Sequence, residues 1–171
     1  MNEKLPRFAW LRALGREEMP SRIRLHGIDY THLRTYKHDF FAATGLYAGA
    51  AGRVILKIGR RAPFSGVPLS WIGKYLANHE RRIYEAVQDL PGVPRCLGRW
   101  GETGFAHAFV EGHPLQRDEW VDDAFFPRLA AIIDALHARG IAYVDLEKRE
   151  NILVNAYGQP SLIDFQISWR W

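Results

Sequence analysis

Two aspartates and an asparagine lie close together near the end of the sequence, each at the edge of an apolar run. Asp145 and Asn151 fall in IAYVDLEKRENILV, and Asp164 falls in SLIDFQIS a short way downstream. Carboxylate and amide oxygens are hard ligands, so three such groups beside strand ends would suit a divalent metal ion and phosphate. The alternative is that all three are ordinary turn residues, because Asp and Asn favour turns through local hydrogen bonds.

The pattern of apolar residues predicts the elements that position these groups. Between Tyr30 and Arg60, aromatic and β-branched runs broken by glycine predict three antiparallel strands. A helix is predicted in PLSWIGKYLANHERRIYEAVQDLPGVP, where apolar residues keep helical spacing until Pro91 and Gly92. Two short strands are predicted in RCLGRW and GFAHAFVEG, and GHPLQ is predicted to be a connector.

The C-terminal part is predicted to hold a second helix and two small strands. The helix lies in AFFPRLAAIIDALHARG, after the N-cap candidates Asp122 and Asp123 and before Gly140. The strands Ile152–Val154 and Ser161–Ile163 are joined by the turn NAYGQP. Asp145, Asn151 and Asp164 therefore follow or flank these elements.

Composition limits the class of protein. The chain has 171 residues, 47% hydrophobic and 13% aromatic, which predicts one compact domain or two small lobes and argues against disorder. No run approaches the roughly 18 apolar residues of a spanning helix, and the start lacks the apolar core of a secretory signal, so we expect a cytoplasmic protein. The single cysteine, Cys96, excludes an internal disulfide framework and a Cys-rich zinc site, and we expect it to be a small buried apolar residue.

The charge is unevenly distributed. The net charge is +4, but residues 1 to 61 hold 12 Lys and Arg against 5 Asp and Glu, a balance of +7. Such a bias would suit nucleic acid, an anionic membrane surface or a polyphosphate, and the alternative is a plain solvated face. A short basic amphipathic helix is predicted at the start, packed on the protein's own surface or lying on a membrane, from the spacing of four apolar residues: Leu5, Phe8, Leu11 and Leu14.

With the elements in this order, LHARGIAYVDLEKRENILV and LIDFQIS resemble the catalytic and metal-binding loops of the protein kinase superfamily. RVILK resembles the strand with the phosphate-binding lysine, which would be Lys57, and HERRIYEAVQDLPGVP resembles the helix whose glutamate pairs with it, Glu80. HAFVEGHPL resembles the hinge, where the backbone of Ala108 and Val110 would hold adenine. The resemblance is to small atypical bacterial kinases, either serine/threonine-kinase-like or close to the lipopolysaccharide core (Kdo or heptose) kinases.

This resemblance implies an α+β, protein-kinase-like bilobal fold with an antiparallel-sheet N-lobe and a reduced helical C-lobe. The expected organisation is an N-terminal basic helix and lead-in over residues 1–29, the N-lobe and hinge over 30–112, and the reduced C-lobe with its loops over 113–171. The nucleotide would be ATP, the metal Mg²⁺, and the acceptor a hydroxyl of a protein (Ser/Thr) or of a lipopolysaccharide-type sugar. The basic N-terminal third suggests peripheral association with an anionic membrane at the inner face.

The resemblance also implies a role for each site residue. Asp145 would accept or orient the proton of the attacking hydroxyl, with Lys57 as the charge for the phosphates and Glu80 as its ion-pair partner. Asn151 and Asp164 would ligate Mg²⁺. Lys148 would touch the γ-phosphate or lie exposed in its loop.

Several positions depart from the family pattern. Tyr143 and Val144 replace His-Arg, so control by a phosphorylated activation loop is not expected. Asn151 follows Asp145 by six positions instead of five, and Gln166 stands where the family has glycine, which favours one fixed conformation. The glycine-rich loop is poorly matched, so phosphate would be cradled by a loop around Lys37 to Phe41, or that loop is a plain hairpin tip.

Two rival functions follow from these departures. The chain is a pseudokinase if it keeps the fold and binds nucleotide or a partner without turnover. A nucleic-acid-binding module is a weaker rival, because no RNA- or DNA-binding signature occurs and the aromatic residues are expected in the core.

Overall fold

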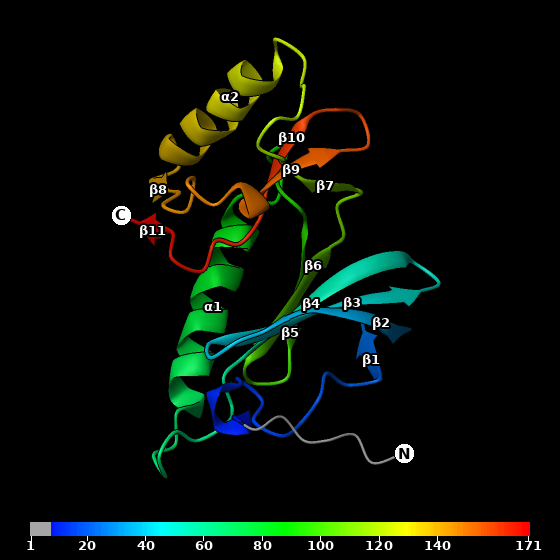
Figure 1. The fold of residues 1–171 in the computed structure, drawn as a ribbon, viewed down its shortest axis with the longest axis vertical. Coiled ribbons are helices and arrows are strands. Elements are labelled where there is room, and N and C mark those ends of the chain that lie inside the picture. The colour runs from blue at the N-terminus through cyan, green and yellow to red at the C-terminus, as the bar shows by residue number, and fades with distance from the viewer. Residues whose placement is uncertain (1–7) are drawn as a thin grey trace. The chain divides into compact units, whose positions relative to one another are not determined.

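The computed structural model describes residues 8–171, which are drawn as a ribbon in Figure 1. Its internal contacts divide the chain into two units. The first contains the residues up to His79 together with Leu97–Ala108, and the second contains Glu80–Cys96 and Phe109–Trp171. Within residues 8–171, no helix is both long and apolar enough to cross a membrane.

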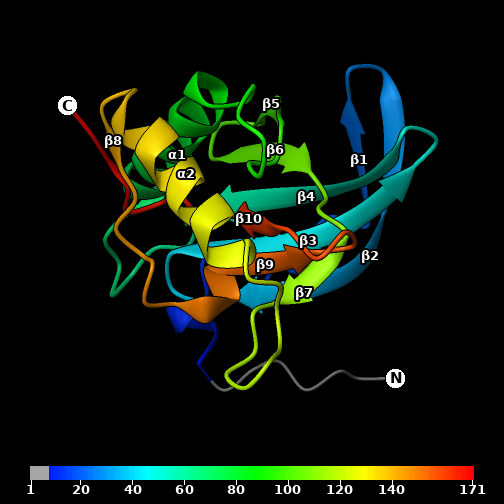
Figure 2. The same cartoon turned by 90° about the horizontal axis from the view of Figure 1, so that it is seen from above.

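A six-stranded sheet forms most of the first unit, in the order β1-β2-β3-β4-β6-β5. Neighbouring strands from β1 to β4, and β4 with β6, pair antiparallel. The sequence predicts this arrangement for the three strands between Tyr30 and Arg60, and it does not predict β1. Figure 2 shows β2, β3 and β4 curving together, as twisted antiparallel strands do. The strands are β1 (Arg22–Leu25), β2 (Ile28–His38), β3 (Ala42–Gly49), β4 (Gly52–Gly59), β5 (Cys96–Trp100) and β6 (Gly104–Ala108).

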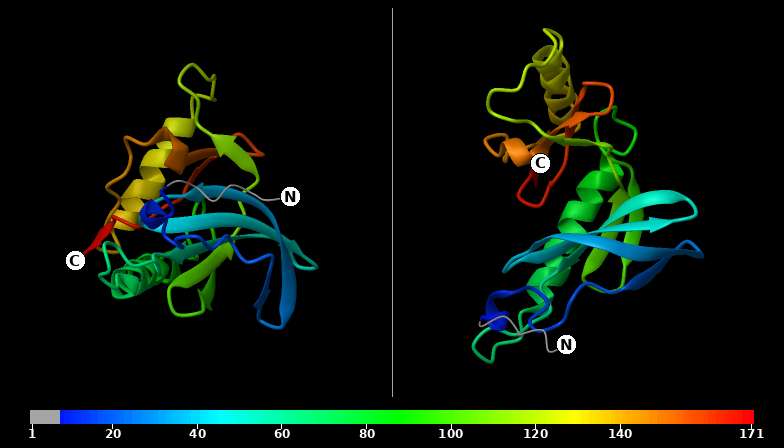
Figure 3. Two further views of the ribbon diagram at one scale, coloured as in Figure 1. Left: turned by 60° about the horizontal axis from the view of Figure 1, so that its bottom comes forward. Right: turned by 45° about the vertical axis from the view of Figure 1, so that its right-hand side comes forward.

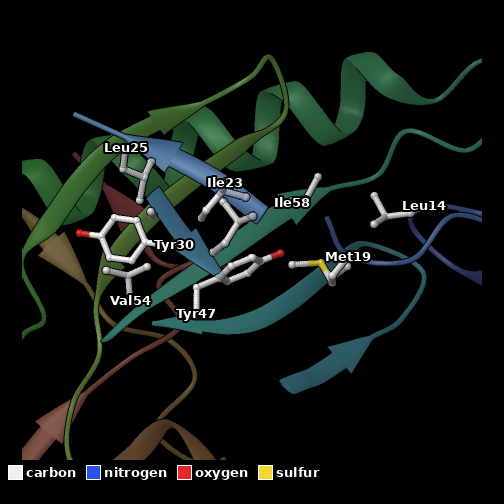
Figure 4. Packing of buried hydrophobic residues seen from close by; sticks show 11 residues of the cluster. Leu14, Met19, Ile23, Leu25, Tyr30, Tyr47, Val54 and Ile58 are labelled. Atoms are coloured by element: carbon white, nitrogen blue, oxygen red, sulfur yellow. The ribbon is translucent and has the colours of Figure 1, made fainter. Parts of the chain in front are cut away.

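One face of this sheet is covered by the N-terminal segment to make the core of the unit. Figure 4 shows Leu14 and Met19 of that segment meeting side chains of the strands. The core is closed by a tyrosine, Tyr47, whose fully buried hydroxyl donates a hydrogen bond to the carbonyl of Pro20 at 2.8 Å. The strand residues in this core are mostly aliphatic: Ile23, Leu25, Val54, Leu56 and Ile58, together with Tyr30.

Helix α1 (Ser70–Ala86) begins beside the end of β4. A Cβ on Gly73 would lie 2.1 Å from the carbonyl oxygen of Arg60, so only glycine allows the helix backbone to come this close. The predicted helix is confirmed, although it ends at Ala86, before Pro91. The stretch from Glu80 onward belongs to the second unit.

The second unit combines α2 (Phe125–His137) with two small sheets. Helix α2 packs against β10 and β8, and the right panel of Figure 3 shows it beside the β9–β10 hairpin. One sheet has the order β10-β9-β7, and the other pairs β11 with β8. The strands are β7 (Gly112–Pro114), β8 (Ile141–Ala142), β9 (Ile152–Asn155), β10 (Pro160–Leu162) and β11 (Trp169–Arg170).

Strand β7 corrects the prediction of a connector in GHPLQ. Its residues pair antiparallel with β9, with Gly112 opposite Asn155. A Cβ on Gly112 would lie 2.2 Å from the carbonyl oxygen of Val154, so the glycine makes this pairing possible. Three residues without alternating apolar character gave no strand signal in the sequence.

The predicted N-terminal amphipathic helix is wrong for the described residues. Ala9–Leu11 form a short 3-10 helix and the chain then turns, while Leu5 lies outside the described residues. The reason is that the backbone groups are bonded elsewhere: the Ala13 amide donates to the Asp39 carbonyl at 2.6 Å, and the Ala13 carbonyl accepts from the Arg61 amide at 2.8 Å. The segment is thereby tied to the sheet and cannot form helical bonds.

The remaining expectations are met in part. Helix α2 is confirmed, but its N-cap is Ala124, with no side-chain cap. Asp122 instead forms an exposed ion pair with Arg128 at 2.9 Å. Cys96 is half-buried, and the end of the chain forms β11 while Trp169 stays 66% exposed.

Candidate functional site

Asp145 lies in the loop that follows β8. The loop is closed by the Lys148 amide, which donates to the Asp145 carbonyl at 3.2 Å, and by the Asn151 amide, which donates to the Lys148 carbonyl at 2.9 Å. A 3-10 turn over Arg149–Asn151 then leads into β9. The extra residue between Asp145 and Asn151 is thus absorbed by two consecutive tight turns.

Lys148 is held by Asp145. Its ammonium donates to Asp145 Oδ2 at 2.7 Å, while the Asp145 side chain is 15% exposed and the Lys148 side chain is 53% exposed. This hydrogen bond is the main cause of the raised pKa of Lys148, and the charges of Asp145 and Asp164 contribute as well. The displaced lysine therefore stays next to the candidate catalytic carboxylate.

Asn151 is buried in the same unit with its side-chain amide only partly used. Its residue is 4% exposed, and its Nδ2 has no hydrogen-bond partner. Its carbonyl accepts from the Ile163 amide at 3.0 Å, which ties the loop of Asp145 to the residue before Asp164. A buried amide with an unsatisfied atom costs stability, which makes it a candidate for a functional group.

Asp164 adopts a left-handed backbone conformation, with φ of 60°. This conformation is uncommon for a residue that is not glycine, although Asp tolerates it better than most, and the neighbours of Asp164 help to hold it. The Asp164 amide donates to the Tyr84 hydroxyl at 3.1 Å, and the Ile163 carbonyl accepts from the Tyr143 hydroxyl at 2.6 Å. The backbone is therefore fixed on Asp164 and on the residue before it.

Phe165 anchors the other side of Asp164. Its ring is fully buried and makes edge contacts with two tyrosines, at centroid distances of 4.9 Å from Tyr84 and 5.1 Å from Tyr143. Ser168 is 2% exposed, and its amide donates to the Phe165 carbonyl at 3.0 Å. The segment after Asp164 is thereby held in one conformation.

The carboxylates of the site contribute to the raised pKa of both tyrosines, Tyr84 and Tyr143. Burial raises the pKa of Tyr84 well above its ordinary value, and the charges of Glu80 and Asp164 raise it further. Burial also raises the pKa of Tyr143, and Asp164 and Asp145 add to this effect. The charges of Asp145 and Asp164 thus both act on Tyr143 and on Lys148.

These residues fit a magnesium ion. Mg²⁺ is commonly held by one or two carboxylates while phosphate and water complete its shell. Asp164 supplies a carboxylate, and Asn151 supplies a buried amide that can be turned to offer its oxygen. Within residues 8–171, no group of three or more His, Cys, Asp or Glu is placed to hold a metal ion.

Lys57 belongs to the first unit and lies on the face of the sheet opposite the core. It is half-buried on β4, and its cross-strand partners are Thr44 on β3 and Phe105 on β6. Its sequence neighbours Leu56 and Ile58 point into the core cluster, as strand alternation requires. Lys57 therefore shares its face of the sheet with the partly buried Thr44 and the apolar, buried Phe105.

The other predicted residues have defined places, but their roles stay predictions. Glu80 is 2% exposed on α1, one helical turn before Tyr84. Ala108 ends β6, and its carbonyl accepts from His107 Nδ1 at 2.9 Å. Val110 is half-buried in the segment between β6 and β7.

The tip between β2 and β3 is a self-contained turn. Asp39 Oδ1 accepts from the amides of Phe41 and Ala42, each at 2.9 Å, and the Asp39 amide donates to the Ala42 carbonyl at 3.0 Å. Burial alone would raise the pKa of Asp39, but bonds from Lys37 and Ala42 outweigh it and the pKa is lowered. Since these amides are already used, the tip matches a plain hairpin better than a phosphate cradle.

Sequence reasoning missed the tyrosines that position Asp164. Tyr84 looked like one more apolar position of a helix, and Tyr143 looked like a replacement for a family histidine. Their partners lie far along the chain, 80 residues away for Tyr84 and 20 for Tyr143. The departure at Tyr143 was the one available signal.

No known protein-family model matches the sequence, and no curated protein sequence is significantly similar to it. Solved structures do match. The Rio2 kinase from Chaetomium thermophilum, in a complex described as ADP/Mg²⁺-phosphoaspartate, aligns with a TM-score of 0.62 at 19% identity, over 80% of this chain and 48% of that one. Another structure of that kinase aligns with a TM-score of 0.59 at 20% identity, over 76% of this chain and 47% of that one.

This chain therefore spans about half the length of the structures that it matches. At this level of identity the likeness establishes the fold. The observed order of a six-stranded antiparallel sheet with a long helix, followed by a unit with few helices, agrees with it. The chain has an α+β, protein-kinase-like fold with a reduced helical C-terminal unit.

Proposed function

We propose that the chain is an ATP- and Mg²⁺-dependent phosphotransferase that moves the γ-phosphate to a hydroxyl group. The observation that carries the proposal is the convergence of Asp145, Asn151 and Asp164 in one part of the second unit, with Asp164 held in a costly conformation. A protein maintains such strain only where the surrounding structure enforces it, and this is common at functional sites. The kinase-like fold supports the same interpretation.

Each residue has a role in this proposal. The acceptor oxygen attacks the γ-phosphorus, the bond to the bridging oxygen breaks, ADP leaves, and the hydroxyl proton passes to Asp145 or through it to solvent. Asp164 and Asn151 would hold Mg²⁺, which would neutralise phosphate charge when bound. Lys57 supplies positive charge for the α- and β-phosphates, and Lys148 orients Asp145.

For the acceptor we propose a serine or threonine of a protein, or a sugar of a lipopolysaccharide-type glycolipid. The Rio2 kinase structure is described as an ADP/Mg²⁺-phosphoaspartate complex. We therefore include transfer to the chain itself among the outcomes to be measured. Intact-mass measurement after incubation with ATP detects a phosphoryl group kept on the protein as well as one passed on.

The test combines ADP production with ATP-dependent thermal stabilisation, with and without Mg²⁺. Asp164→Ala should lose the Mg²⁺-dependent part of the stabilisation, while Asp145→Ala should keep it and lose turnover by about 100-fold or more. Asp118→Ala, which removes an exposed carboxylate elsewhere in the second unit, serves as the control. If ATP neither stabilised nor was consumed by the wild type, the proposal would be overturned.

The pseudokinase is a second candidate, because one observation favours it. The β2–β3 tip uses three backbone amides internally, those of Asp39, Phe41 and Ala42, which leaves fewer amides for phosphate than a glycine-rich loop offers. Stabilisation by ATP with no ADP formed and no phosphoryl group on any acceptor would establish this alternative.

A further inference from the structure

Strand β2 contains two irregularities that change which side chains share the face of Lys57. Its register with β3 shifts between His32 and Arg34, and again between Thr35 and Lys37. At each shift two residues of β2 stand opposite one residue of β3, which is the mark of a β-bulge. Such bulges redirect side chains. The face on which each β2 side chain lies therefore follows from the β3 residue opposite it.

The cross-strand partners show where Lys37 points. Thr35 stands opposite Gly45, and a Cβ on Gly45 would meet the core residues Met19 and Tyr47, so Thr35 belongs to the core side. In an unbroken strand Lys37 would share that side, because it lies two residues further on. The bulge at Tyr36 instead puts Lys37 opposite Thr44.

Thr44 connects the two lysines. It stands opposite Lys37 on one side and opposite Lys57 on the other, and directly opposed residues share a face. The three residues therefore form a row, Lys37–Thr44–Lys57, across β2, β3 and β4. Adjacent strands lie about 4.8 Å apart, so the two lysine backbones are separated by about 10 Å.

A second row reinforces the basic character of this face. Arg34 stands opposite Leu46, which stands opposite Ile55, two residues before Lys57. The guanidinium of Arg34 lies over the Tyr36 ring at 4.9 Å, which places both side chains on the same side of β2. The two bulges thus add cations to a face that already carries Lys57.

Lys37 can exchange its present partner for a phosphate. Its ammonium lies 2.8 Å from Asp39 Oδ2, and its side chain is 58% exposed. An exposed ion pair of this kind is worth little, so breaking it costs little. His38 has no such freedom, because its ring nitrogens contact the Leu14 amide at 3.2 Å and the Arg12 guanidinium at 2.5 Å.

We propose that the row Lys37–Thr44–Lys57 is the polyphosphate-binding element of this protein, and that its side chains replace the backbone amides of a glycine-rich loop. The inference rests on the proposed nucleotide binding and specifies how it is achieved. Two lysines on backbones about 10 Å apart, with a hydroxyl-bearing residue between them, present long flexible side chains that can contact successive phosphates of one chain. The β2–β3 tip needs only to fix the end of the row.

The experiment measures dissociation constants for ATP, ADP, AMP and adenosine. Lys37→Met should weaken ATP binding about tenfold, affect AMP less and leave adenosine unchanged, since each lost charge–phosphate contact weakens only phosphate-bearing ligands. The loss should shrink as salt is raised. Lys37→Arg, which keeps the charge, should retain most of the affinity, and Thr44→Val should show a smaller loss.

Lys74→Met is the matched control, because Lys74 is 50% exposed and has a weak ion pair with Glu102 at 3.9 Å in the same unit. It should leave every constant unchanged. If Lys37→Met and Lys74→Met gave the same dissociation constants while the wild type bound ATP, the proposed role of the row would be wrong and the proposed nucleotide binding would stand. Absence of ATP and adenosine binding by the wild type would overturn the proposed function together with the row. Equal melting temperatures without ligand verify that the variants fold.

Discussion

Tyr84→Phe tests whether Asp164 is held in its conformation from a distance. The substitution removes one hydroxyl and keeps the ring that packs on Phe165 at 4.9 Å. That hydroxyl accepts the Asp164 amide at 3.1 Å, and Tyr84 is fully buried. The variant therefore removes the hydrogen bond to the Asp164 amide and changes little of the packing.

Two contributions determine how far Tyr84→Phe lowers the free energy of unfolding. A net hydrogen bond contributes about 0.5–1.5 kcal/mol, and a buried amide left without a partner costs about 1–3 kcal/mol. We expect the free energy of unfolding to fall by about 1–3 kcal/mol. Because the left-handed conformation of Asp164 itself costs about 1–2 kcal/mol, losing the bond removes the support that offsets this strain.

Two measurements separate stability from function. Urea denaturation gives the free energy of unfolding, and ATP titration with and without Mg²⁺ gives the metal-dependent part of the affinity. Tyr84→Phe should lower both. Tyr47→Phe is the control, since it removes a buried hydroxyl that donates to Pro20 at 2.8 Å in the first unit, and it should lower stability alone. If Tyr84→Phe kept the full Mg²⁺-dependent affinity, the hydroxyl would not position Asp164.

Three further variants test other parts of the structure. Asn151→Leu should abolish the Mg²⁺ dependence of ATP binding, because it removes the buried amide that would hold the ion. Gly112→Ala should lower the urea midpoint by an amount equivalent to about 1–3 kcal/mol, since its Cβ would meet the Val154 carbonyl oxygen at 2.2 Å; an unchanged midpoint would contradict the close pairing of β7 with β9. Burial lowers the pKa of His38 and the charge of Arg12 adds to this, while Glu18 and Asp39 oppose it. A histidine with a lowered pKa in the folded state contributes stability above its unfolded pKa of about 6.5, and this stability is lost as pH falls. The wild type should therefore lose more stability than His38→Gln between about pH 7.5 and 5.

The sequence predicts the elements whose signals are local. The β-branched run RVILKIG and the helical spacing after Pro68 give β4 and α1, and the order of motifs gives the kinase-like fold. Strands β8 and β11 escaped prediction because each has two residues and exists only through the other. Their pairing joins the chain before Asp145 to the chain after Asp164. The two strands that the sequence did not predict therefore connect the segments that carry these two residues.

The bulges in β2 are a second feature that the sequence alone does not predict. Alternation read from the sequence places Thr35 and Lys37 on one face, and the structure separates them because Tyr36 is an extra residue in the ladder. Nothing in the strand itself marks that position, because the register is fixed by β3 and by the Asp39 turn at the end of the hairpin. Which cations can reach a phosphate is therefore decided by pairing and not by spacing.

Gln166 is the departure whose structural meaning is now clearest. Glycine at this position would allow large changes in φ, and its absence predicted a single conformation. The positive φ occurs at Asp164, two residues earlier, and Gln166 is not among the residues with positive φ within 8–171. A glycine is therefore not needed here, because edge contacts of Phe165 with Tyr84 and Tyr143 help to hold the conformation. Removing a flexible residue and adding two buried aromatic contacts both stabilise one state, so we expect this loop to stay in place when nucleotide binds.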